Sequence, residues 1–190
     1  FVLDGTAMAK AAGYVQDHLP SVSRVDSRRE ANRLAYQLYV LAEYGATADR
    51  EAGGELGLAI RLFEKRHLLD QYGQATLAMV LALLESGERG RVETLLSNLV
   101  GEAITTATGT HWEEAEPDYW NMNTDIRTTG IVLWALSRLE PDSEFLPNTV
   151  RWLMAARREG YWATTQGTAW SLLALVVSIT LLLCRPARKW

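Results

Sequence analysis

The chain has 190 residues, of which 48% are hydrophobic, and this is enough apolar material for the core of one domain. Lysine and arginine number 19 against 23 aspartate and glutamate residues, which gives a formal net charge of −4 with both signs scattered. No basic stripe of the kind that binds nucleic acid is present, so we expect no nucleic-acid partner. The single cysteine, Cys184, excludes an intrachain disulfide and a cysteine-based zinc site.

The chain begins Phe-Val-Leu-Asp, without a leading methionine or the basic region that opens a signal peptide. We therefore expect a fragment of a longer protein, whose targeting signal, if it has one, lies upstream of this sequence.

Apolar residues at helical spacing predict an all-α protein with no sheet. Leu34, Leu38 and Leu41 stand at positions i, i+4 and i+7, and the same kind of stripe recurs further along the chain. No segment alternates apolar and polar residues for long, and clusters of β-branched residues are few. In chain order the predicted helices cover 31–44, 54–66, 73–86, 90–107, 125–139, 145–158 and 167–183.

These helices alternate in character. The first, third, fifth and seventh are strongly apolar and are expected to lie inside, whereas the other three carry more charge and are expected to lie outside. The inner segments resemble one another, and two helices in each copy indicate stacked α-hairpins. Such hairpins form either an open solenoid or a closed α/α toroid. The irregular spacing of the copies and the tryptophans in the loops favour the toroid.

Residues 111–120 hold four carboxylates and two tryptophans. Glycosidase clefts use paired carboxylates beside aromatic rings, so one alternative is a toroidal enzyme with Glu113, Glu114, Asp118 or Asp125 as acid and base. The other interpretation is a solvated acidic loop. His111 with a nearby glutamate lacks the two histidines at i and i+4 of a zinc-binding helix, and we predict neither a metal nor a cofactor.

An apolar run from Ala169 to Cys184 invites comparison with a membrane span. A transmembrane helix needs roughly 18 or more such residues, and this run is shorter. We expect a buried terminal helix.

Three segments carry a resemblance to a known family. They are 123–129 (Asn-Thr-Asp-Ile-Arg-Thr-Thr), 146–154 (Leu-Pro-Asn-Thr-Val-Arg-Trp-Leu-Met) and 162–169 (Trp-Ala-Thr-Thr-Gln-Gly-Thr-Ala). Together they resemble the thioester-containing domain of α2-macroglobulin and the complement thioester proteins, most closely the bacterial branch, and the likeness runs from about residue 25 to 175. The positions that match family motifs, expected on a structural rim, are Trp112, Asn123, Thr124, Arg127, Trp162, Thr165 and Gln166.

The resemblance implies an α/α toroid of helical hairpins, with activity in a Cys-x-x-Gln thioester. That motif is missing, because the residue three positions after Cys184 is Ala187. We therefore expect residues 1–175 to be a partial toroid that lies downstream of the thioester, and residues 176–190 to be an atypical helix end and tail. Within its loops, Trp112 and Trp162 are expected to occupy equivalent places on one rim.

The function implied by the resemblance is that of a scaffold, with no catalytic residue of its own, in a protease-trapping protein. Its partners would be attacking proteases, reached through the parent protein, and neighbouring domains of the same chain. The parent would be extracellular, periplasmic or in the cell envelope, and the fragment would self-associate through an uncovered apolar face. A toroidal glycosidase and a helical solenoid that binds another protein are the alternatives.

Overall fold

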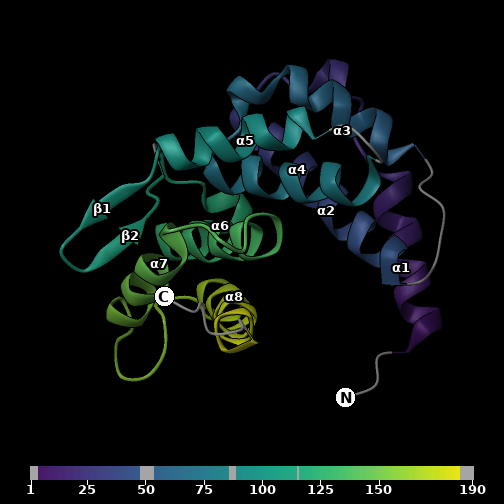
Figure 1. The fold of residues 1–190 in the computed structure, drawn as a ribbon. Helices are drawn as coiled ribbons and strands as arrows, with labels where there is room; N and C mark the ends of the chain where they lie inside the picture. Colours follow the sequence, from purple (N-terminus) through teal and green to yellow (C-terminus); the bar gives the residue numbers. More distant parts are fainter. Residues whose placement is uncertain (1–3, 48–53, 86–88, 115, 185–190) are drawn as a thin grey trace.

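The computed structural model describes residues 4–47, 54–85, 89–114 and 116–184, and this part of the chain is mostly helical (Figure 1). The prediction of an all-α fold is confirmed. The α-helices are α1 (Gly5–Asp17), α2 (Arg28–Thr47), α3 (Glu55–Glu64), α4 (Gln71–Leu84), α5 (Gly90–Gly101), α6 (Asp125–Leu139), α7 (Phe145–Ala155) and α8 (Thr165–Cys184). Short 3-10 helices stand at η1 (Val22–Arg24), η2 (Arg66–Leu68) and η3 (Tyr119–Asn121).

The expectation of no sheet is wrong. The predicted helix over 90–107 ends at Gly101, and the chain then forms an antiparallel hairpin of β1 (Ile104–Thr106) and β2 (Gly109–His111). The reason is local: isoleucine and threonine are β-branched and favour strands. Gly109 also takes a φ of +134° beside the α7 backbone, where a side chain would meet the Asn148 carbonyl.

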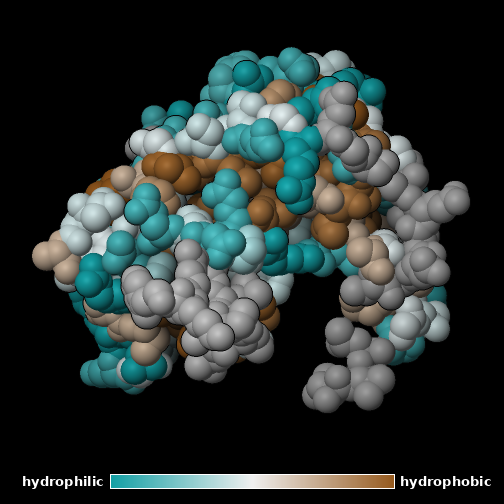
Figure 2. Space-filling model, in the orientation of Figure 1, coloured by the Kyte–Doolittle hydropathy of each residue, from teal (hydrophilic) through white to brown (hydrophobic). Residues whose placement is uncertain are grey.

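The helices form two layers, as the alternation in their hydrophobicity predicts. α2, α4, α6 and α8 pack in that order in the inner layer, and α3, α5 and α7 cover them (Figure 1). α4 is buried continuously from Tyr72 to Leu81, and α6 is buried over most of its length. Figure 2 shows hydrophilic side chains over the upper edge of the molecule and a hydrophobic band across the middle of this face.

The inner helices all run in the same direction. At their beginnings, Arg28 of α2 forms an ion pair with Asp70, the residue before α4, at 2.7 Å. At their ends, Arg138 of α6 pairs with Glu43 of α2. Parallel inner helices are what repeated hairpins require, because each outer helix carries the chain back to the starting edge. That edge is called the rim below: it comprises the beginnings of α2, α4, α6 and α8 with the loops that lead into α4, α6 and α8.

Aromatic side chains join α2 to α6 and α8, so the inner layer is strongly curved. The indole Nε1 of Trp134 in α6 donates to the Tyr39 hydroxyl of α2 at 3.0 Å. The ring of Trp170 in α8 lies 6.1 Å from that of Tyr39 and 6.3 Å from that of Trp134. Edge-on and tilted packing at such distances stabilises aromatic clusters.

The terminal helix α8 is buried on one face only, which corrects the expectation of a buried helix. Trp170, Ser171, Ala174, Leu175 and Ser178 face α6 and the core. On the other face apolar side chains are exposed: Leu172, Leu173, Val176 and Ile179. Among the described residues, no helix has the length and apolarity that crossing a membrane requires. The Cys184 side chain and residues 185–190 lie outside the described part.

Helix α1 was not predicted from the sequence. Its first turn is capped by Asp4, whose carboxylate accepts from the backbone N–H of Thr6 at 2.9 Å. Its apolar residues are mainly alanines, and only Ala12 among the residues of the helix is buried.

Candidate functional site

Two tryptophans bind the ends of successive outer helices. Trp112 follows β2, is fully buried, and donates its indole Nε1–H to the carbonyl of Leu99 at 2.7 Å. Trp162 donates in the same way to the carbonyl of Leu153 at 2.9 Å. Each acceptor is the third residue from the end of its helix, α5 or α7. Carbonyls in the last turn have no partner within the helix, so each indole satisfies a group that would otherwise be unpaired.

The backbone of each tryptophan then contacts the inner helix that follows. The carbonyl of Trp112 accepts from the Thr129 hydroxyl at 3.3 Å, and the carbonyl of Trp162 accepts from the Thr168 hydroxyl at 3.2 Å. Each loop is therefore fixed to the end of an outer helix by its indole and to the start of an inner helix by its main chain. These bonds hold the rim.

Threonine hydroxyls cap both inner helices at the rim. Thr124 accepts from the backbone N–H of Arg127 at 3.2 Å, and Thr164 accepts from that of Gly167 at 2.9 Å. Thr165 is the first residue of α8 and is exposed, so the cap is its neighbour. Gln166 is half-buried and lines a pocket together with Arg127.

Asn123 and Arg127 form a buried polar network at the start of α6. The Asn123 amide donates to the Thr128 hydroxyl at 2.9 Å, and its Oδ1 accepts from Nη1 of Arg127 at 3.0 Å. The guanidinium lies between the rings of Tyr36 and Tyr72, with Cζ 4.9 and 5.1 Å from the two ring centres. Stacking on two aromatic faces is a favourable environment for arginine.

Glu114 is the carboxylate most altered by the fold. Its Oε1 accepts from the Thr128 hydroxyl at 2.8 Å, and its backbone N–H donates to Asp125 at 2.8 Å. The pKa of Glu114 is raised to about 7: burial is the main cause, the Thr128 bond acts against it, and the nearby charges of Asp70, Asp125 and Asp118 add to the rise. At neutral pH this side chain therefore exists in both protonation states.

Asp118 is buried and bound on both oxygens. It accepts from the Tyr72 hydroxyl at 3.2 Å, from the Asn121 side-chain amide at 2.6 Å and from the Asn121 backbone at 3.2 Å. Burial, and then the charge of Asp118, raise the pKa of Tyr72 above its ordinary value, so Tyr72 is a neutral donor.

Asp70 and Asn32 join the rim to α2, and the sequence analysis missed this pair. The amide of Asn32 donates to the Asp70 carboxylate at 2.7 Å, and its Oδ1 accepts from the Asp70 backbone at 3.0 Å. Burial raises the pKa of Asp70, while Arg28 and Asn32 oppose that shift. Gly73 permits the contact, because a Cβ there would lie 2.2 Å from Asn32 Oδ1. A glycine in the first turn of an apolar helix, within a segment that resembles the family (68–73), was the local signal.

His111 and Glu113 form a second polar pair beside the hairpin. The distance from Nε2 to Oε1 is 3.0 Å, and the imidazole stacks on Trp152 with ring centres 4.4 Å apart. His111 is buried, its Nδ1 has no partner among the described residues, and Glu113 is exposed. Both line a surface pocket of about 720 Å³ with Asp125.

Residues 56–177 match the sequence profile of the A-macroglobulin TED domain. This chain belongs to that family. The match covers α4 to α7, with most of α3 and α8. It therefore includes both tryptophan loops and the rim carboxylates Asp70, Glu114 and Asp118. No curated protein sequence matches the chain at a significant level. The thioester-domain resemblance noted from the sequence is thus confirmed. The TED family is not, in general, a family of enzymes.

The four carboxylates of the glycosidase alternative each have a hydrogen-bonding partner in this TED domain. Asp118 is bound by Tyr72 and Asn121, Glu114 by Thr128, and Asp125 by the Glu114 backbone. Glu113 is exposed and paired with a histidine. An acid and base for sugar cleavage need unbound carboxyl groups on either side of one bond. The hydrogen bonds of Asp118, Glu114 and Asp125, of which the Tyr72–Asp118 bond is buried, favour structural roles. Among the described residues no group of three or more histidine, cysteine or acidic side chains could hold a metal.

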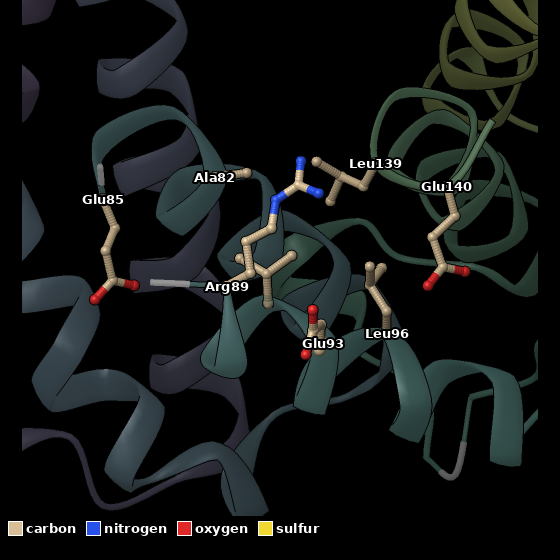
Figure 3. Close-up of a pocket in the computed structure, with 8 residues that line it drawn as sticks. Ala82, Glu85, Arg89, Glu93, Leu96, Leu139 and Glu140 are labelled. Carbon is tan, nitrogen blue, oxygen red and sulfur yellow. The ribbon is translucent and has the colours of Figure 1, made fainter. Parts of the chain in front are cut away.

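A further pocket lies at the opposite end of the TED domain, between the end of α4, α5 and the end of α6 (Figure 3). Its volume is about 360 Å³. Figure 3 shows Arg89 extending into it toward Leu139, with Glu93 below and Glu140 at the right. Glu85 at its edge forms an ion pair with Arg91. Two of the three family-like segments, 123–129 and 162–169, lie elsewhere, at the rim.

Proposed function

We propose that this TED domain is a scaffold part of an α2-macroglobulin-like protein that traps proteases, and that it holds no reactive thioester itself. One observation carries the proposal: the family match over residues 56–177 occurs in a sequence without any Cys-x-x-Gln. The only cysteine is followed by Arg-Pro-Ala. A thioester needs a cysteine sulfur and a glutamine carbonyl in one short loop, and no such loop can form from these residues.

The proposal divides the chain into two parts. Residues 1–175 supply part of an α/α toroid, and residues 176–190 end it in an atypical way. Parallel inner helices and a layer that curves until α2 meets α8 support the toroid. In the parent, cleavage by a protease changes the conformation and exposes the thioester, which acylates the attacker. This part of the domain provides the frame.

The rim residues have structural roles in the proposal. Trp112 and Trp162 fix the loops, Thr124 caps α6, and Asn123 with Arg127 fills the space between helix beginnings. Thr165 and Gln166 begin α8 at the same edge. Each tryptophan loop is bound both to an outer helix and to an inner helix, so the rim is rigid. A rigid rim is suited to holding neighbouring domains of the same chain in fixed positions.

Partners and location follow from the same role. The partners are the attacking protease, met through the parent protein, and neighbouring domains of that protein. Proteases that must be trapped act outside the cytoplasm, so the parent functions outside the cell, in the periplasm or in the cell envelope. The scattered charges and net charge of −4 support a protein partner over nucleic acid.

The test compares the parent protein with this chain. Each is incubated with trypsin and examined on denaturing gels for high-mass species that contain the protease. We expect the parent to form an adduct that boiling in detergent does not dissociate and that methylamine pretreatment abolishes, whereas the 190-residue chain forms none. A parent that neither forms an adduct nor slows trypsin toward large substrates would overturn the protease-trapping role.

A further inference from the structure

Arg127 is a buried cation with an unused hydrogen-bonding edge. Its residue exposure is 4%, and its Nη1 is bound by the Asn123 side chain and, at 3.4 Å, by the Asn121 carbonyl. Nε is buried and has no partner, and Nη2 donates to no other residue in the described part of the chain. Arginine is rarely buried to this extent unless it is paired.

The carboxylates nearby are already bound by other groups. Asp118 accepts from Tyr72 and Asn121, Asp70 from Arg28, and Glu114 from Thr128. Within the described residues no carboxylate lies within the 4.0 Å ion-pair distance of the Arg127 guanidinium. The unused edge, Nε with Nη2, is the one that binds a carboxylate through two parallel hydrogen bonds.

Arg127 lines a pocket of about 190 Å³ at the rim. α2 contributes Arg33, Tyr36 and Gln37, α8 contributes Gln166, and the loop before α6 contributes Trp120. Two arginines and no acidic side chain line it. The Oε1 atom of Gln37 is buried without a partner, which leaves an acceptor for an N–H donor. The Trp120 ring is 80% exposed; the Arg29 guanidinium lies over it, 5.2 Å from its centre, and the other face of the ring offers a flat apolar surface.

We propose that this pocket binds a carboxylate that stands next to an amide N–H and an apolar or aromatic group. The carboxylate pairs with Nε and Nη2 of Arg127, the N–H donates to Gln37, and the apolar group packs on Trp120. Arg33 adds a second positive charge at the entrance. This chemistry occurs both in a free N-acyl amino acid and at the C-terminus of a peptide.

A small anion such as phosphate fits the pocket less well. It would use the guanidinium but leave the Gln37 acceptor and the Trp120 ring without partners. Its doubly charged form is also normally held by several backbone N–H groups or a cluster of cations, whereas a single buried fork suits a planar carboxylate.

The experiment titrates the whole chain with N-acetyl-phenylalanine and, as a matched control, with N-acetyl-phenylalaninamide, which lacks only the negative charge. The signal is the indole N–H resonance of Trp120, assigned with Trp120→Phe. We expect saturable shifts with the acid and at least about tenfold weaker binding of the amide. A tetrapeptide ending in phenylalanine distinguishes the sources: tighter binding than the free acid indicates a peptide terminus, and equal binding indicates a free acid.

Variants test the assigned contacts. Arg127→Lys keeps a charge but loses the fork, and we expect binding to weaken by about tenfold or more. Arg33→Gln and Trp120→Ala change exposed side chains, so they keep the test informative if Arg127→Lys does not fold. Because Trp120→Ala lacks the indole signal, the binding of the acid to every variant is measured by isothermal titration calorimetry, and each exposed variant should weaken it by about threefold. Equal binding of acid and amide, or no shift at millimolar acid, or binding unchanged in both exposed variants, would refute the proposal.

Discussion

Trp112 and Trp162 make the same hydrogen bond in successive hairpins: each indole N–H reaches the carbonyl of the third residue from the end of the preceding outer helix. The carbonyl of each tryptophan also accepts from a threonine of the following inner helix. The two loops differ in length and content, and one includes the β-hairpin. The shared bonds are therefore what the hairpins have in common at the rim.

Replacing either tryptophan with phenylalanine should destabilise the fold. Trp112→Phe and Trp162→Phe keep most of the apolar volume but leave the Leu99 or Leu153 carbonyl unpaired, which costs about 1–3 kcal/mol in the free energy of unfolding. Urea denaturation followed by circular dichroism measures this. Trp120→Phe, at an exposed position, is the matched control, and its free energy of unfolding should stay within about 0.5 kcal/mol of that of the unmodified chain. Equal stability of all three variants would remove the structural role of the indole bonds.

Gly73→Ala should destabilise the protein although alanine is the better helix former. The new Cβ would lie 2.2 Å from Asn32 Oδ1 and disturb the buried bonds between Asn32 and Asp70. We expect a loss of about 1–3 kcal/mol by thermal or urea denaturation. Gly13→Ala in α1 meets nothing within 4 Å and should be neutral or stabilising by up to about 1 kcal/mol. A neutral Gly73→Ala would show that the Asn32 contact is dispensable.

Stability should fall as pH rises through the titration of Glu114. Its folded pKa of about 7 lies above the ordinary value of 4.5, so the folded state holds the proton more tightly than the unfolded state. The stabilisation from that proton is complete below about pH 4.5 and is lost by about pH 7 to 8.

Glu114→Gln removes this titration while keeping an acceptor for Thr128. Relative to the unmodified chain, the free energy of unfolding of the variant should rise by about 1 kcal/mol between pH 5 and pH 8. This value is reduced for solvent screening, because the group is half-exposed. Urea midpoints across that range provide the measurement. Glu116→Gln, in the exposed part of the same loop, should show the same dependence of the urea midpoint on pH as the unmodified chain. If the difference in stability between the unmodified chain and Glu114→Gln did not change with pH, the raised pKa of Glu114 would be contradicted.

The exposed face of α8 should cause self-association. Leu172, Leu173, Val176 and Ile179 form a contiguous apolar stripe, and a repeat helix normally buries such a stripe against a neighbour. We expect the sedimentation coefficient to rise with protein concentration. Leu173→Glu with Val176→Glu should lower the association, whereas Ser97→Glu on the exposed face of α5 should not. Strictly monomeric behaviour at millimolar concentration would count against this surface.

Helix positions were predictable where the sequence has both a stripe and a boundary signal. The prediction of 125–139 coincides with α6, because Thr124 provides a cap and an apolar stripe follows it. Helix α1 was missed; its apolar residues are mainly alanines, which make a weak stripe. The hairpin was missed because its strands are three residues long, too short for alternation to be visible.

The contacts of the rim depend on residues distant in sequence, and this limited what could be predicted. Asn32 meets Asp70 across 38 residues, and neither belongs to a recognisable catalytic or metal motif. Glu114 looked like a solvated residue, and only the packing of the loop against Thr128 raises its pKa. In α8 every side is apolar, so periodicity could not show which face lacks a neighbour.

The central claim is that this TED domain forms a scaffold without a reactive acyl bond, and treatment with methylamine tests it most directly. The purified chain is incubated with methylamine, and its intact mass and the number of thiols per denatured chain are measured before and after. We predict no change in mass and one titratable thiol both times, because Cys184 has no glutamine three residues later. Incorporation of methylamine at a glutamine, with a thiol that becomes titratable only afterwards, would contradict the account.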